Sequence, residues 1–222
     1  MFWSRLVYVC SLSKIIRIFC TMESSSGLKC SQSPEDKLPS QVSTQPWIRL
    51  HSPKKCEYLS SISRSASTRN EQTKNNDSID ISKIGKWLLF NNIRKRNTAG
   101  LTQHDEAWQA VRELVSNDVL FSAKCSTVWK GPYAGKSSTR KGVICCYTPD
   151  YSDKQDVKRV ADSIRNTVHY PMDMYYKADV DTYAGKYSKF GDTAVSMYKH
   201  TIKNAMYERD PTDKKKWNLL DV

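Results

Sequence analysis

The pattern of apolar and polar positions divides the chain near residue 83. From Lys86 onward apolar residues recur at the spacing of strands and helices, whereas between Thr21 and Ser82 they stand isolated among Ser, Thr, Asn, Gln and Pro. Such a polar segment cannot bury enough surface to offset its chain entropy. We therefore predict a disordered or weakly ordered extension over residues 1–82, a folded domain over 83–206, and a polar, loosely ordered tail over 207–222.

Two short apolar stretches interrupt this division. The segment PWIRL at 46–50 either docks on the domain, serves as a short partner motif or is buried incidentally. The stretch Trp217–Leu220 in the tail could also dock on the domain.

Within the domain, the pattern predicts the order strand, helix, strand, strand, helix, strand, strand. One helix follows Thr102, with Asp105 near the position of a capping box, and a second follows a cap at Ser152. The predicted strands are 86–90, 123–129, 142–148, 173–177 and 193–199. Each helix has one apolar stripe, and Trp87 and Trp108 lie on apolar faces typical of a core. This predicts an α+β fold in which helices cover one face of a mostly antiparallel sheet; a ferredoxin-like fold also fits the pattern.

The net charge of the chain also indicates a class of binding partner. The chain has 222 residues with 35 Lys and Arg against 23 Asp and Glu, a net charge of +12. Residues 83–222 alone contain 24 basic and 16 acidic residues, so the predicted domain is itself basic. An excess of this kind favours RNA, a nucleotide or an acidic protein surface as partner.

Other classes of protein lack support in the sequence. There is no apolar run of the roughly 20 residues that a membrane span needs. The seven cysteines are irregularly spaced and the four histidines are scattered, so we expect no metal, no cofactor and a reducing compartment. No nucleophile motif is present. We predict a monomeric, non-enzymatic protein of the cytoplasm or nucleus.

Residues 1–21 form a basic segment without acidic residues, and three interpretations of it stay open. It has the composition of a mitochondrial transit peptide, which would change the predicted location, or of a weak signal anchor. Alternatively, Met22 is the start of the working protein.

Several blocks of the sequence together resemble the basophilic-leukaemia-expressed protein family. They are GKWLLF at 85–90, DEAWQAVREL, SAKCST, VICCYTPDYSDKQDVKRVADSIR and MYYKADVDTYAGKY, in matching order over roughly residues 84–200. The fold of that family is similar to that of the eukaryotic cap-binding translation initiation factor, which implies a curved antiparallel sheet backed by helices. The resemblance does not bring cap binding with it. A cap site needs two aromatic rings around a methylated base, and only Trp129, with Tyr133 or Tyr151, is placed to supply them.

The candidate binding residues lie on strands and on one hairpin loop. Lys124 and Lys177 fall within strands, and Tyr183 lies in a turn rich in tyrosine and glycine. The loop after Trp129 interleaves basic residues with glycine and tyrosine, which suits a phosphate backbone and a stacked base. The predicted RNA- or nucleotide-binding set is Lys124, Trp129, Lys130, Lys136, Arg140, Lys177 and Tyr183. The alternatives are a protein-interaction module for an acidic partner and an enzyme acting on a phosphorylated small molecule.

Overall fold

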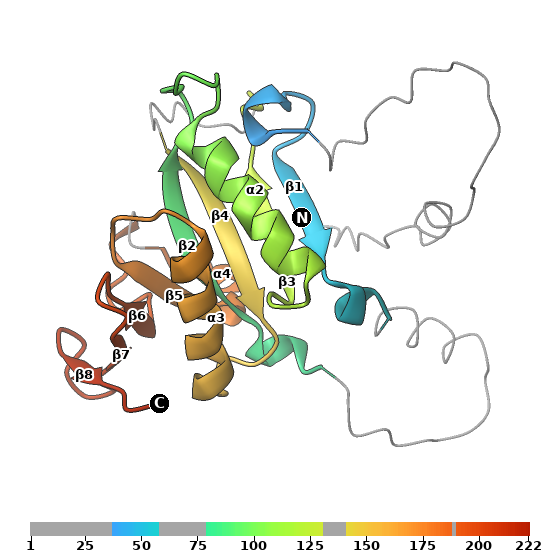
Figure 1. The fold of residues 1–222 in the computed structure, drawn as a ribbon. Coiled ribbons are helices and arrows are strands. Elements are labelled where there is room, and N and C mark those ends of the chain that lie inside the picture. The colour runs from blue at the N-terminus through green and yellow to red at the C-terminus, as the bar shows by residue number, and fades with distance from the viewer. Residues whose placement is uncertain (1–36, 58–78, 131–140, 188–189) are drawn as a thin grey trace, which may run out of the picture. The chain divides into compact units, whose positions relative to one another are not determined.

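The computed structural model describes residues 37–57, 79–130, 141–187 and 190–222, which all belong to one unit of the chain, Gln32–Val222. Their centre is one eight-stranded sheet in which every neighbouring pair of strands is antiparallel (Figure 1). The order across the sheet is β1-β3-β4-β2-β5-β6-β7-β8. The strands are β1 (Trp47–His51), β2 (Gly85–Asn92), β3 (Ser122–Ser126), β4 (Lys141–Thr148), β5 (Met174–Ala178), β6 (Tyr198–His200), β7 (Met206–Arg209) and β8 (Trp217–Leu219). The predicted α+β sheet is thereby confirmed.

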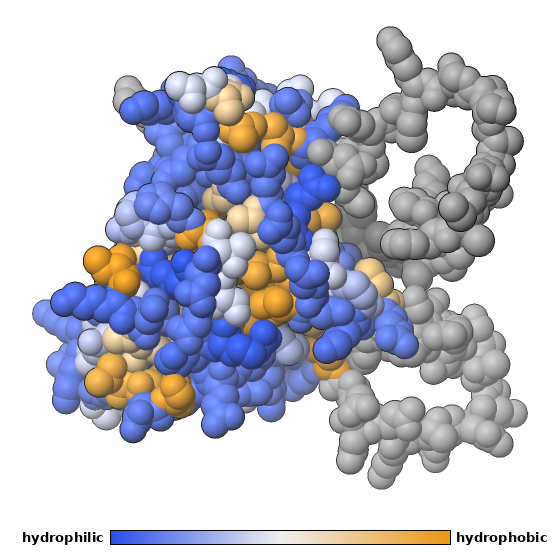
Figure 2. Space-filling view, in the orientation of Figure 1, coloured by the Kyte–Doolittle hydropathy of each residue, from blue (hydrophilic) through white to orange (hydrophobic). Residues whose placement is uncertain are grey.

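Two helices cover one face of the sheet, α2 (Gln103–Ser116) and α3 (Lys154–Thr167) (Figure 1). The Thr102 hydroxyl accepts from the Asp105 amide at 3.1 Å and the Asp105 carboxylate accepts from the Thr102 amide at 2.9 Å, which is the reciprocal capping that fixes where α2 begins. The cap of α3 is Asp153 and not the predicted Ser152, because the Asp153 carboxylate accepts from the Asp156 amide at 3.0 Å. On the side that Figure 2 shows, hydrophilic residues predominate at the surface, as expected where amphipathic helices face solvent.

The space between these helices and the sheet is the core. Trp87 on β2 and Trp108 on α2 are both 0% exposed, as predicted. The Trp87 indole donates to the Val157 carbonyl on α3 at 3.0 Å and packs edge-on against Tyr176, with ring centroids 5.1 Å apart. The core therefore uses one face of the sheet and leaves the other without α2 or α3.

The sheet extends beyond the predicted limits of 83–206 on both sides. The apolar segment at 46–50 contributes β1, which pairs with β3 from Trp47 opposite Ser126 and buries Ile48 completely. The predicted tail carries β7 and β8, which pair from Tyr207 opposite Leu219. Both segments are short, and their side chains alternate between the two faces of the sheet. Each therefore contains too few apolar residues for a strand to be predicted from the sequence alone.

Two predicted strands are shorter than expected, since β3 ends at Ser126 and the predicted strand 193–199 is represented only by β6. The inner strands β2 to β5 with α2 and α3 follow the βαββαβ connectivity of a ferredoxin-like unit, and β1 and β6–β8 widen it. The predictions for residues 1–21 lie outside the described residues. None of the helices that the structure describes is long and apolar enough to cross a membrane.

Candidate functional site

The side of the sheet opposite α2 and α3, here called the open face, is basic and aromatic. Side chains alternate along a strand and paired residues share a face, so the strand pairing identifies its members. The basic ones are Arg49, Lys86, Lys124, Lys141, Lys177, Lys199 and Arg209, and the aromatic ones are Trp47, Phe90, Tyr147, Tyr175, Tyr207 and Trp217. Among the strands that the structure describes, none contributes an acidic residue to this face.

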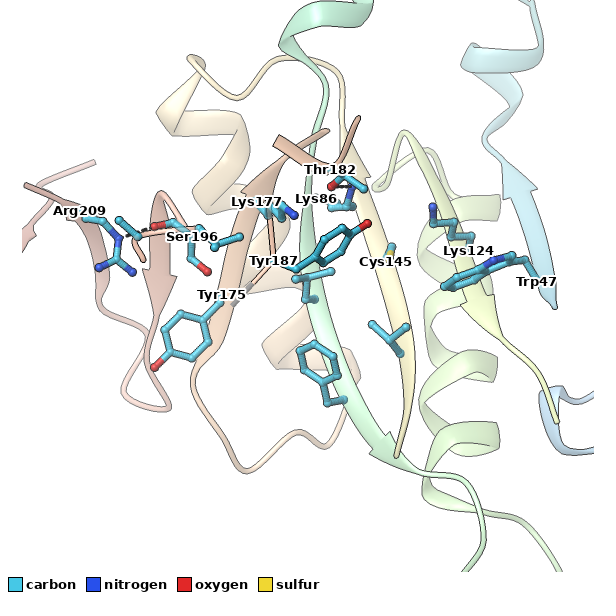
Figure 3. Close-up of a pocket in the computed structure, with 15 residues that line it drawn as sticks. Trp47, Lys86, Lys124, Cys145, Tyr175, Lys177, Thr182, Tyr187, Ser196 and Arg209 are labelled. Carbon is cyan, nitrogen blue, oxygen red and sulfur yellow. Dashed lines mark hydrogen bonds between the residues drawn. The ribbon is translucent and has the colours of Figure 1, made fainter. Parts of the chain in front are cut away.

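A half-open cavity of about 750 Å³ lies on the open face. Its lining includes lysines from three strands, Lys86 on β2, Lys124 on β3 and Lys177 on β5, and no residue of α2 or α3. Figure 3 shows Lys124 beside Trp47 at one end of the cavity, with Lys177 close to Tyr187 near the middle. This volume lies in the range of sites for small molecules and cofactors.

Lys86 is buried, with 3% of its surface exposed, the same fraction as for Lys177. Its side-chain nitrogen forms an ion pair with Asp179 and donates to the Thr182 hydroxyl at 2.9 Å. Both partners belong to α4 (Asp179–Tyr183), a single turn that follows β5 directly and therefore holds them over the paired strand. Because Asp179 compensates its charge, Lys86 forms part of the cavity wall and does not act as a free cation.

Lys124 has a different environment. Its nitrogen lies 4.9 Å from the centre of the Trp47 ring and 5.6 Å from that of Tyr147, and it has no hydrogen bond or ion pair to any residue of the described segments. Burial lowers the pKa of Lys124, and the neighbouring charges of Lys86 and Arg49 lower it further. An uncompensated, half-buried ammonium of this kind is stabilised by an anion that enters the cavity.

The charge of Lys177 is compensated less than that of Lys86 and more than that of Lys124. Its nitrogen donates to the Lys186 carbonyl and lies 4.1 Å from the centre of the Tyr187 ring. Burial lowers the pKa of Lys177 and so does Lys86, while Asp181, Asp179 and Asp192 oppose the change. The Tyr187 ring is 37% exposed, so a ligand can reach it from the cavity.

The cavity contains only part of the predicted set. Lys124 and Lys177 line it together, whereas Trp129 is half-buried after the end of β3 and is not part of the lining. Lys130 is exposed outside the cavity, and Tyr183 is 82% exposed on α4. Lys136 and Arg140 lie outside the described residues.

Sequence reasoning missed most of the lining, including Lys86, Trp47 and Tyr187. For Lys86 a signal existed, because strand alternation places it on the face opposite the buried Trp87. For Trp47 there was none, since its strand is identified only by a partner far along the chain.

The described residues contain no group of three or more His, Cys, Asp and Glu side chains that could hold a metal ion. Cys145 lies between Tyr187 and Lys124 in the cavity (Figure 3), and burial raises the pKa of its thiol. The thiol is therefore protonated near neutral pH and contributes an apolar surface.

The family described as basophilic leukemia-expressed protein Bles03 matches residues 67–185. The chain belongs to the Bles03 family. The Bles03 match spans β2 to α4 and so includes Lys86, Lys124 and Lys177, whereas β1 and β6–β8 lie outside it.

Proposed function

We propose that the protein binds RNA or a nucleotide at the cavity on the open face. The observation that carries this proposal is the convergence of Lys86, Lys124 and Lys177, from three strands, on one cavity whose lining also includes Trp47 and Tyr187. Lysine ammonium groups bind phosphate, and exposed aromatic rings stack on bases.

The charge balance supports an anionic ligand. Lys86 lowers the pKa of both Lys124 and Lys177, so these cations repel one another across the cavity. A bound phosphate offsets that repulsion, and the half-buried position of Lys124 strengthens the attraction relative to that of a fully solvated lysine.

The rings give a reason to favour a nucleotide over an acidic protein segment. Lysines already lie over Trp47 and Tyr187 at 4.9 and 4.1 Å. A base that stacks on either ring would place its phosphate near the adjacent lysine, whereas a carboxylate side chain would leave the rings unused. In Figure 3 the two rings are separated along the cavity, so we expect a single stacked base at each and no sandwich around a methylated cap.

The test is fluorescence anisotropy of the full chain with short labelled RNA, capped and uncapped, between about 50 and 200 mM salt. Two phosphate contacts to a single strand, one from Lys124 and one from Lys177, predict a slope of log affinity against log salt of about −1.4. Lys124→Gln should weaken binding about five- to tenfold and make the slope shallower by about 0.7. The matched control is Lys203→Gln, in the exposed turn after β6, which removes the same charge away from the cavity.

Two results would count against the proposal. One is an absence of RNA binding at the lowest salt. The other is an equal loss of affinity in Lys124→Gln and Lys203→Gln, since this would reduce the effect to net charge. Retention of an acidic protein without RNA binding would favour the interaction-module alternative.

A further inference from the structure

A second basic and aromatic cluster lies on the open face, on strands β6–β8. Lys199 lies 4.8 Å from the ring centre of Tyr207 and 5.2 Å from that of Trp217. The guanidinium of Arg209 on β7 lies 4.1 Å from the ring of Trp217 on β8. Tyr175 on β5 lies 6.2 Å from Trp217 between ring centroids. We call Lys199, Arg209, Tyr207, Trp217 and Tyr175 the second cluster.

The strand pairing builds this cluster. Tyr175 is opposite Lys199, and Lys199 is opposite Tyr207, so the three residues form one row across β5, β6 and β7. Arg209 is opposite Trp217 in the next row of the same face. The Arg209 side chain is fixed, because its Nε donates to the Ser196 carbonyl at 2.6 Å.

Lys199 resembles Lys124 in its surroundings. It is half-buried, lies over aromatic rings, and has no hydrogen bond or ion pair to any residue in the described ranges. Tyr175 is 40% exposed, so a planar group can approach it from solvent. The second cluster thus repeats the chemistry of the cavity, a free ammonium beside accessible rings.

The two sites are continuous on the surface. Tyr175 and Arg209 line the same cavity as Lys124 and Trp47, at its opposite end (Figure 3). From β3 to β7 the sheet has five intervals between strands. At about 4.8 Å each, these intervals span roughly 24 Å. One nucleotide is too short to reach both ends, whereas a strand on the order of five nucleotides is long enough.

We propose that the open face binds a single-stranded polynucleotide that crosses the strands, with separate nucleotides at the cavity and at the second cluster. This inference rests on the proposed function and narrows its ligand from any nucleotide to a chain of phosphodiesters with unstacked bases. A duplex hides its base faces, so it cannot use the rings of either site. RNA and single-stranded DNA share the required chemistry.

The experiment is a length series against the full chain. Unlabelled nucleoside monophosphate and oligonucleotides of about two, four, six and eight residues compete with a labelled RNA of about eight residues. Affinity should rise with length and level off near five or six nucleotides. A DNA octamer of the same sequence separates the two sources, because tighter RNA binding assigns a contact to the 2′-hydroxyl.

Variants connect the length effect to the second cluster. Lys199→Gln should weaken octamer binding about five- to tenfold and leave the competition by monophosphate and dinucleotide unchanged. Lys124→Gln should weaken all lengths, and Lys203→Gln is the matched charge control. Trp217→Leu removes the shared ring and provides a second probe, with circular dichroism as the check on folding.

The outcomes separate this inference from the function on which it rests. If the monophosphate competes as well as the octamer, or if Lys199→Gln binds the octamer like the parent, the extended site is refuted and the cavity proposal stands. If no polynucleotide binds at any length, both proposals fail. A steep rise with length together with loss in Lys199→Gln supports the extended site, and it does so even if the monophosphate is too weak a competitor to detect.

Discussion

Replacing Asp179 by Asn should destabilise the protein strongly, because Lys86 is buried beside it. Only 3% of Lys86 is exposed, and its two polar partners are the Asp179 carboxylate and the Thr182 hydroxyl. Asn preserves the shape but removes the negative charge, which leaves a buried ammonium without compensation. Loss of one member of a buried ion pair costs about 3–5 kcal/mol. Since the Asp179 side chain is 14% exposed and the amide oxygen of Asn can still accept, we expect about 3 kcal/mol.

Urea unfolding followed by tryptophan fluorescence measures this loss. With an m-value of about 2 kcal/mol/M, the midpoint should fall by about 1.5 M. Asp181→Asn is the matched control on the same turn, because its ion pair with Lys186 is exposed. That variant should lose less than about 1 kcal/mol.

A double variant refines the test. Lys86→Met combined with Asp179→Asn removes both charges, so it should be more stable than the sum of the single losses predicts. The reasoning is refuted if the urea midpoint of Asp179→Asn lies within about 0.5 M of that of the parent. It is also refuted if the double variant loses as much stability as Lys86→Met and Asp179→Asn lose in sum.

Three further predictions concern the rest of the fold. Burial lowers the pKa of Lys55 to about 8 from 10.5, so between these values the unfolded chain holds a proton that the folded chain has released. Stability should therefore rise with pH across this window by more in the parent than in Lys55→Met, as measured by urea unfolding of both at pH about 7.5 and about 10. In Gly142→Ala the new methyl carbon would lie 2.8 Å from the His104 ring, and overpacking of about 1–3 kcal/mol should lower the Tm by about 3–10 °C in a thermal melt. Trp87→Phe should lower the free energy of unfolding, measured in urea, by about 1 kcal/mol more than Trp108→Phe does. Both rings are buried, but among the described residues only the Trp87 indole has a hydrogen-bond acceptor. Equal losses would refute this.

The helices and inner strands could be predicted because their signals are local. The hydroxyl of Thr102 and the carboxylate of Asp105 lie three residues apart, and the apolar stripes of both helices repeat within a few turns. Lys124 and Lys177 were predicted as site residues for the same reason, since each lies inside an evident strand. The cap of α3 was displaced by one residue because Ser152 and Asp153 are both good cap residues.

The edges of the sheet and half of the cavity could not be predicted, because they depend on pairing between distant segments. Trp47 reaches the cavity only when β1 pairs with β3, and nothing near residue 47 signals that partner. The tail was predicted as polar since β7 and β8 bury little, with Met206 as the one fully enclosed side chain. Trp129 was favoured for stacking from its place at the end of a predicted strand, but β3 ends before it and Trp47 takes the position beside Lys124.

The pairing of β1 with β3 also bears on the order in which the protein assembles during synthesis. Trp47 lies opposite Ser126, so β1 leaves the ribosome roughly 80 residues before its partner strand and waits for about 4–16 s at ordinary rates of synthesis. Over that interval its tryptophan and isoleucine have no sheet to join, whereas β6, β7 and β8 pair with immediate neighbours in sequence. The wall of the cavity that holds Trp47 thus depends on a long loop being closed at the edge of the sheet, and we expect it to form late and to open early. A ribosome-bound chain that stops before residue 122 would carry Trp47 exposed, and it would be a natural target for chaperones that hold unpaired apolar strands.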